Sequence, residues 1–191
     1  PAGSFEDAKT PIQPVIDRDP TNAEAQLVLG NALLGLKDLS GAVREIEEAI
    51  RLDPDRGGAY TTLAAARLAQ GDREQAKASL QKAVEVEPRS SGARLLLAYF
   101  YWVTGEIVAA EQAYKDAVAV DEKNALANRS IAAFYAGTKR AQMAEPYLKN
   151  VAATGDAAAV LQLADYYLLM RRPLSGAQTA DALKRLVGAD A

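Results

Sequence analysis

The chain has 191 residues, with 22 Lys and Arg, 25 Asp and Glu, and a formal net charge of −3 at pH 7. It contains no histidine and no cysteine, which excludes disulfides, thiol chemistry, zinc sites of the usual nitrogen and sulfur type, and triads with a histidine base. The acidic balance argues against a nucleic-acid partner, because nucleic-acid binding usually needs a basic patch. Roughly a fifth of the residues are alanine, the best helix former, which predicts closely packed helices.

Membrane-spanning segments and reactive motifs are also missing from the sequence. The longest apolar run, residues 95–103, is far shorter than the roughly 18 residues of a membrane span. We find no glycine-rich phosphate loop, no GxSxG motif and no cluster of metal ligands. We therefore expect no membrane span, no cofactor, no metal and no catalytic residue, and classify the chain as non-enzymatic.

One sequence phrase recurs at a constant interval along the chain. It ends at Pro20, again at Pro54 and again at Pro88, and these three prolines are evenly spaced. A further copy ends at Glu122, one more interval after Pro88, with Glu in place of Pro. A fixed period of this length indicates a repeat architecture. The chain is therefore interpreted as one elongated array rather than as one or two globular domains.

Each copy has the pattern of two helices. The first half is an apolar run with helical spacing, such as Leu29, Leu33 and Leu36, and a short break follows, with glycine at Gly71 and Gly105. Glycine supplies the left-handed residue that ends a helix. The second half has small or apolar residues at helical spacing, and proline then ends it because proline lacks an N–H group. Each copy is predicted to form two antiparallel helices of about three turns.

The copies resemble the tetratricopeptide repeat (TPR) family. The repeat pattern of that family has large residues at positions 4, 7, 11 and 24, small residues at 8, 20 and 27, and proline at 32. In the first copy, which starts at Ala23, these positions hold Gln26, Leu29, Gly30, Leu33, Ala42, Ile46, Ala49 and Pro54. The resemblance implies an all-α fold, a right-handed α-solenoid of about 11 antiparallel helices in which stacked repeats complete one another's core.

The register divides the chain into one half repeat and five repeats. Residues 1–22 are expected to form the second helix of a truncated repeat. TPR repeats are expected over residues 23–56, 57–90, 91–124 and 125–156, the last of these being short. A fifth, irregular repeat is expected over residues 157–191, with an insertion near residues 173–176.

Prolines mark two irregular places. Pro11 and Pro14 lie in the expected N-terminal helix, which we predict to be kinked, short or displaced. A terminal element tolerates this; the alternative is that the element mimics a partner helix or exchanges between molecules. Pro146 predicts a bent second helix in the fourth repeat. After it, Gly155 is expected to end that helix and Asp156 to cap the next one.

In the family, positions 2, 5, 9, 12 and 13 of the first helices chiefly line a concave groove. Carried over residue by residue, the resemblance implies a mostly apolar groove. The candidate partner-binding residues are Leu27, Asn31, Leu34, Thr61, Leu68, Leu95, Tyr99, Trp102, Arg129 and Asp165.

An aromatic stripe lies within this set. Leu95, Tyr99 and Trp102 stand at i, i+4 and i+7 and share one helical face, whereas Phe100 and Tyr101 point elsewhere and are better core candidates. The stripe has two interpretations: anchors for a bound peptide or helix, or packing against the neighbouring repeat.

The few charged or amide side chains of the groove give a weaker signal. Arg129 is expected either to pair with Asp165 or to receive a partner carboxylate. One TPR subclass binds acidic tails of heat-shock chaperones through a clamp of Lys, Asn and Arg side chains. At the corresponding positions this chain matches only at Asn31, so we expect no such clamp.

Three functions follow as hypotheses. The first is a protein-interaction scaffold that binds a peptide or helix in the groove. The second is a structural spacer, or a segment that self-associates through open solenoid ends. The third is an accessory domain of a larger bacterial envelope, secretion or exopolysaccharide protein. The sequence starts at Pro1 rather than Met and shows no targeting segment, so it is interpreted as a fragment. Its localisation is left open between the bacterial cytoplasm and the periplasm.

Overall fold

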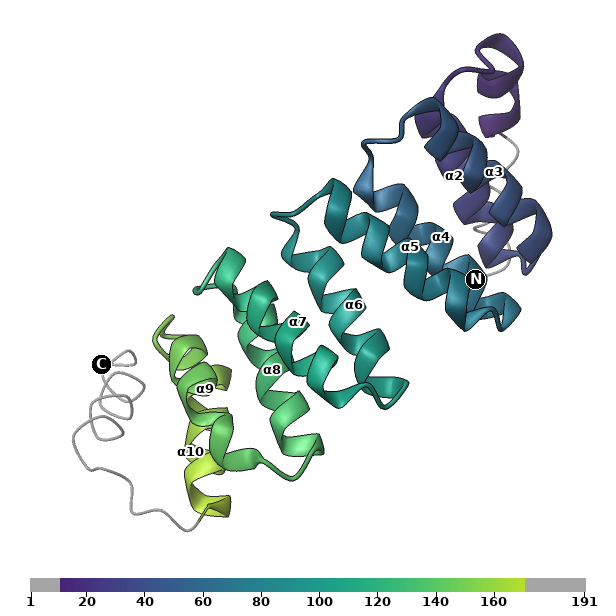
Figure 1. The fold of residues 1–191 in the computed structure, drawn as a ribbon. Coiled ribbons are helices and arrows are strands. Elements are labelled where there is room, and N and C mark those ends of the chain that lie inside the picture. Colours follow the sequence, from purple (N-terminus) through teal and green to yellow (C-terminus); the bar gives the residue numbers. More distant parts are fainter. Residues whose placement is uncertain (1–10, 171–191) are drawn as a thin grey trace, which may run out of the picture. The chain divides into compact units, whose positions relative to one another are not determined.

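The computed structural model describes residues 11–170, all of whose regular elements are helices (Figure 1). The chain divides into two compact bodies, Pro1–Phe100 and Tyr101–Ala191, each considered by itself. We call them the N-terminal body and the C-terminal body. This helical content confirms the predicted all-α fold.

The N-terminal body consists of paired helices that follow one another along the chain. Residues 11–18 are helical and precede the pairs. The pairs are α2 (Ala23–Gly35) with α3 (Leu39–Leu52), and α4 (Gly57–Gln70) with α5 (Arg73–Val86), and α3 also packs against α4. Helix α6 (Ser91–Val103) begins in this body. Asn22, Asp38 and Asp72 cap the helices that follow them by accepting a backbone hydrogen bond.

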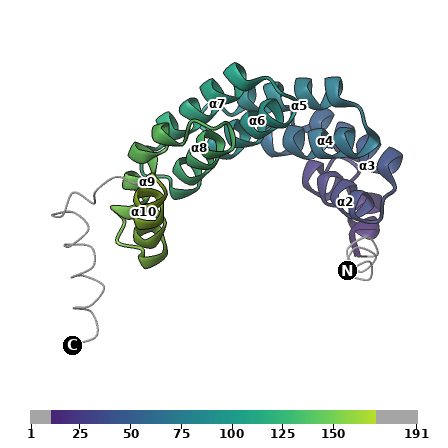
Figure 2. The same cartoon turned by 90° about the horizontal axis from the view of Figure 1, so that it is seen from below.

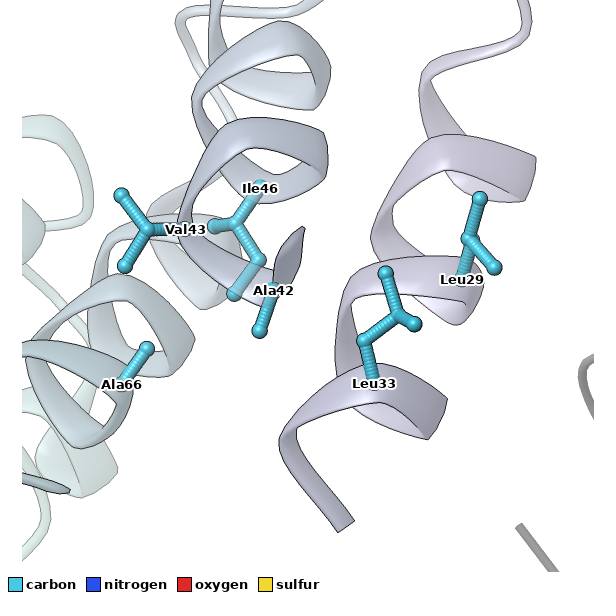
Figure 3. Packing of buried hydrophobic residues seen from close by; sticks show 6 residues of the cluster. All are labelled: Leu29, Leu33, Ala42, Val43, Ile46 and Ala66. Carbon is cyan, nitrogen blue, oxygen red and sulfur yellow. The ribbon is translucent and has the colours of Figure 1, made fainter. Parts of the chain in front are cut away.

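Small residues allow the paired helices to approach closely. Leu29 and Leu33 of α2 face Ala42 and Ile46 of α3 in a buried cluster that Ala66 of α4 extends (Figure 3). A Cβ atom at Gly30 would lie 2.5 Å from Cγ1 of Ile46, so glycine is required there. The small positions of the repeat thus have the packing role that the pattern predicts.

The C-terminal body repeats the arrangement with one irregular repeat. It contains α7 (Ile107–Val120), α8 (Ala125–Gly137), the short 3₁₀ helix η1 (Ala141–Met143), α9 (Glu145–Ala152) and α10 (Ala157–Leu169). Helix α8 packs between α7 and α9, and α9 packs against α10. The large, fully buried side chains here include Phe134, Tyr135 and Ile131 of α8.

The fifteenth position of four repeats is left-handed whichever residue occupies it. Gly71 and Gly105 have φ angles of 87° and 84°, which confirms their predicted role as helix ends. In the other two repeats the same position holds Lys37 and Lys139, with φ angles of 65° and 59°. A lysine in this region is strained because its Cβ crowds the following carbonyl.

A hydrogen bond recurs at the fourth position of four repeats. There a side chain donates to the backbone carbonyl six residues earlier, which belongs to the residue at position 32 of the repeat before. The donor and acceptor pairs are Gln26 to Pro20, Tyr60 to Pro54, Arg94 to Pro88 and Asn128 to Glu122, with distances of 3.5, 3.1, 2.8 and 2.9 Å. Four different donors therefore satisfy equivalent carbonyl groups.

The second helix of the fourth repeat was predicted to be bent at Pro146. Instead, the helix begins at this proline. Pro146 lies in the first turn of α9, where a missing N–H group breaks no helical hydrogen bond. The short 3₁₀ helix η1 precedes α9 and occupies residues where a full-length second helix would already have begun. As predicted, Gly155 is left-handed, with φ of 80°, and the Asp156 side chain caps α10.

The other irregular places fall partly outside the described residues. Pro14 lies within the helical residues 11–18, and Ile12 and Ile16 pack against the core of α2 and α3. Residues 1–10 and the expected insertion near residues 173–176 lie outside the described part of the chain.

Candidate partner-binding surface

In each body the first helices of the repeats lie on one side and the second helices on the other (Figure 2). We call the surface formed by positions 2, 5, 9, 12 and 13 of the first helices the first-helix face. In the N-terminal body it contains seven of the candidate residues. Leu27, Leu34, Thr61 and Leu95 are half-buried, whereas Asn31, Leu68 and Tyr99 are exposed.

In the C-terminal body the first-helix face of α8 and α10 is open throughout. Every one of its ten positions is exposed or partly exposed, and seven of them carry leucine or alanine. The ten residues are Leu126, Arg129, Ala133, Ala136, Gly137, Ala158, Leu161, Asp165, Leu168 and Leu169. Leu161 and Leu168 keep 56% and 68% of their surface in contact with solvent.

Trp102, the aromatic candidate of the C-terminal body, packs against that body. Its ring is half-buried and meets Phe134 edge-on, with ring centroids 5.6 Å apart, and Tyr114 at 6.5 Å. Gly137 leaves room for the indole ring, because a Cβ atom at this position would lie 2.5 Å from Cζ2 of Trp102. The structure therefore assigns Trp102 a packing role, and a role as a partner anchor stays a prediction.

Arg129 pairs with a different carboxylate from the one expected. Its Nη2 atom donates to Oδ2 of Asp156 at 2.8 Å, which ties α8 to the capping residue of α10. No described residue forms a hydrogen bond or ion pair with Asp165 in this structure. The expected pairing of Arg129 with Asp165 is therefore wrong, because Arg129 pairs with Asp156, the residue that caps α10.

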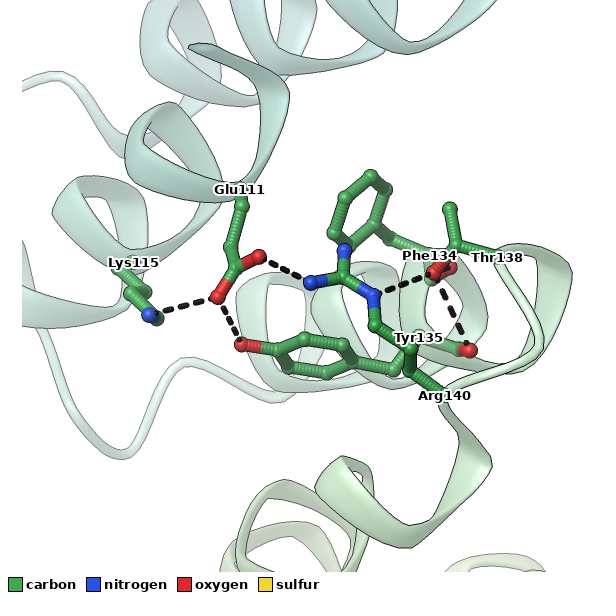
Figure 4. Close-up of polar contacts among 6 residues, drawn as sticks. All are labelled: Glu111, Lys115, Phe134, Tyr135, Thr138 and Arg140. Carbon is green, nitrogen blue, oxygen red and sulfur yellow. Dashed lines mark hydrogen bonds and ion pairs between the residues drawn. The ribbon is translucent and has the colours of Figure 1, made fainter. Parts of the chain in front are cut away.

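A polar network joins α7 to the end of α8 (Figure 4). The carboxylate of Glu111 accepts hydrogen bonds from Lys115, Arg140 and Tyr135. These three donors hold the pKa of Glu111 at about 2, well below its usual value. Burial, together with the bond to Glu111, raises the pKa of the Tyr135 hydroxyl.

The guanidinium of Arg140 also lies over two aromatic rings. Its central carbon is 5.3 Å from the ring centroid of Phe134 and 5.2 Å from that of Tyr135, within the range of cation–π attraction. Sequence reasoning missed this network because its members come from two different repeats. The available signal was Tyr135, since a buried phenol at a core position of the repeat needs a hydrogen-bond partner.

The described residues provide no arrangement for metal chemistry. Residues 11–170 contain no group of three or more acidic side chains that could hold a metal ion. Within the same range, every helix is too short or too polar to cross a membrane.

Comparisons with known proteins agree with the helical repeats. A family model described as tetratricopeptide repeat matches residues 2–66 and 67–134. Comparison with curated protein sequences gave no match. A solved structure of MamA is 25% identical and superposes with a TM-score of 0.66 over 82% of this chain and 92% of that chain.

Two other solved structures share the fold. TTC0263, a thermophilic TPR protein of Thermus thermophilus, is 24% identical, with a TM-score of 0.65 over 87% of this chain and 92% of its own. YrrB, described as a TPR protein with an unusual peptide-binding site, is 16% identical, with a TM-score of 0.60 over 91% and 90% of the two chains. The family model alone covers more than half of this chain. The chain therefore belongs to the tetratricopeptide repeat family, whose members bind protein or peptide partners and are typically non-enzymatic scaffolds.

Proposed function

We propose that the first-helix faces of this protein bind a peptide or helix of a partner protein. The observation that carries the proposal is the open face of α8 and α10, where none of the ten positions is buried and seven are apolar. Soluble proteins seldom leave contiguous apolar surface uncovered unless it serves an interaction. A helix with apolar residues at i, i+3, i+4 and i+7 fits such a face.

Leucines are expected to supply most of the binding energy. Complete burial of a leucine side chain contributes about 1.5–3 kcal/mol, and Leu161 and Leu168 both start from a mostly exposed state. Part of that gain is offset by the lost freedom of the two molecules. Two such anchors give about 3–6 kcal/mol before that cost, less than the roughly 8 kcal/mol of a micromolar complex, so other contacts along the face must contribute as well.

In the N-terminal body the first-helix face is a second candidate surface. It combines apolar side chains, of which Leu68 and Tyr99 are 44% and 56% exposed, with the exposed amide of Asn31. An amide can both donate to and accept from the backbone of an extended peptide. We propose that this face adds polar specificity to apolar contact.

The test replaces the exposed leucines of α10 and compares the result with a matched change elsewhere. Leu161→Ser combined with Leu168→Ser is expected to abolish capture of the proteins that the unmodified chain retains from a bacterial lysate, as identified by mass spectrometry. Val108→Ser is the control, because Val108 is 84% exposed but lies on the second helix α7. Equal capture by both variants would contradict the proposal, provided that both give the helical circular-dichroism signal of the unmodified chain.

Self-association is a second proposal, and the exposed end of α10 favours it. Leu168 and Leu169 are adjacent, and both are largely exposed in the described structure. Light scattering over a concentration range should then show a molar mass that rises with concentration and returns to that of the monomer in Leu169→Ser. A constant monomer mass would eliminate self-association and leave partner binding and the roles of spacer or accessory domain.

A further inference from the structure

Charge on the first-helix faces is sparse and almost entirely paired. Among the five positions taken from each described first helix, only Glu24, Arg129 and Asp165 are charged. Glu24 pairs with Arg56, and Arg129 pairs with Asp156. In the part of the chain that the structure describes, Asp165 is thus the one carboxylate of these faces without a cation.

Asp165 also occupies the centre of the apolar surface of α10. Leu161 and Leu168 stand four residues before it and three residues after it, so all three share one side of the helix. A partner that covers both leucines must therefore also cover Asp165. The two contacts cannot be separated.

Covering an unpaired carboxylate is unfavourable because it loses its hydration. A buried charge is tolerated when an opposite charge and hydrogen bonds replace the water. A neutral partner would gain contact with the leucines, but covering the Asp165 carboxylate would cost it binding free energy. An acidic partner would add repulsion. A partner with a cation at that point gains on both counts.

We propose that the face of α8 and α10 selects a helical peptide in which a Lys or Arg side chain, flanked by apolar residues, pairs with Asp165. This inference rests on the proposed function and names the chemistry of the partner at that same face. Leu126 and Ala133 of α8, both exposed, are further apolar residues of this face, on the same helix as Arg129, which pairs with Asp156. That pair is already neutral, so it gives a partner charge no comparable gain.

The experiment uses a phage-displayed library of helical peptides against the whole chain. Each peptide carries leucine at positions i and i+7, and positions i+3 and i+4 are randomised. Selection on the unmodified protein is expected to enrich Lys and Arg at the randomised positions. Selection on Asp165→Asn should lose that preference, and selection on Asp165→Lys should enrich Asp and Glu instead. Asp121→Asn, which removes an exposed carboxylate outside this face, is the control and should behave like the unmodified protein.

Affinities of the selected peptides complete the test. Replacing the peptide Lys by Gln should weaken binding by about tenfold, equivalent to about 1.4 kcal/mol, and high salt should reduce the difference. Enrichment of neutral or acidic residues on the unmodified protein would overturn this inference and leave the proposed function standing. Peptides that bind Leu161→Ser with Leu168→Ser as well as the unmodified protein, or the recovery of no binding peptide, would overturn both.

Discussion

Replacing Gly137 by alanine should destabilise the C-terminal body even though alanine is the better helix former. The added Cβ atom would lie 2.5 Å from Cζ2 of Trp102. Non-bonded carbon atoms settle near 3.5–4.0 Å, so the indole ring must move by about 1 Å. It cannot move freely, because Phe134 and Tyr114 hold it edge-on at 5.6 and 6.5 Å.

Two opposing effects set the magnitude at Gly137. Overpacking of this kind costs about 1–3 kcal/mol, and the higher helix propensity of alanine returns about 1 kcal/mol at most. The expected net result is a loss of about 1 kcal/mol, the middle of the range that remains when the full gain is subtracted from the cost. Gly58 is the matched control, because it lies in helix α4 with no atom within 4 Å of the added Cβ. There the same substitution should stabilise by up to about 1 kcal/mol.

Thermal and urea unfolding followed by circular dichroism measures both variants. Since the chain has a single tryptophan, its emission reports the displacement of Trp102 directly. The reasoning predicts opposite signs for Gly137→Ala and Gly58→Ala, with a shifted emission maximum only in the first. If Gly137→Ala proved as stable as the unmodified chain and kept its emission, the packing role given to Trp102 would be refuted.

Three further predictions concern polar groups and the strained loops. The pKa of Glu111 is lowered to about 2 in the folded chain, so this carboxylate stabilises the fold above its usual pKa, and the stabilisation is lost as the pH falls from about 4.5 towards 2. In urea unfolding, the free energy of unfolding of Glu111→Gln should therefore fall less steeply with acid than that of the unmodified chain. An equal slope would contradict the network. Lys139→Gly should stabilise by about 1 kcal/mol because φ at this position is 59°, whereas Gly71→Lys should destabilise by a similar amount; a melting temperature that moves the other way in either variant would refute the assignment of strain. Asn128→Leu should destabilise by about 1–3 kcal/mol in thermal unfolding, because the carbonyls of Glu122 and Asn124 lose their donor; unchanged stability would mean that water replaces the amide.

Much of the fold could be predicted from the sequence because stacking repeats leave a periodic trace. Helices α2, α4, α6, α8 and α10 begin at Ala23, Gly57, Ser91, Ala125 and Ala157, the first residues of the expected repeats. The division of the chain into five repeat domains and a half repeat stays a prediction. Periodicity also predicted the left-handed residues at Gly71 and Gly105. Periodicity could not predict that Lys37 and Lys139 adopt the same left-handed conformation. At these two positions the geometry of the turn between the helices outweighs the preference of lysine for negative φ.

The candidate surface was less predictable than the fold. The register indicated which positions face the first-helix side, and the open face of α8 and α10 consists of such positions. The ion pairs between repeats were not predicted correctly. Arg129 was expected either to pair with Asp165 on the next first helix or to receive a partner carboxylate, but it pairs with Asp156 at the start of that helix. Ion pairs between repeats depend on loop geometry, and the fourth repeat has an irregular second helix that periodicity cannot place.

The fourth position of the repeat shows why packing and function separate so clearly in this chain. The family pattern describes that position as large, yet Gln26, Tyr60, Arg94 and Asn128 are all hydrogen-bond donors that reach equivalent carbonyl groups. Their sizes differ, so the requirement that they share is a donor at a fixed distance from the end of the preceding repeat. Requirements of this kind concern the side of each first helix that carries position 4. On the first-helix face, Trp102 and Arg129 have packing or pairing roles, whereas Leu161 and Asp165 are exposed. Exposed residues of that face, such as Leu161 and Asp165, are therefore the ones that a partner can contact without disturbing the core.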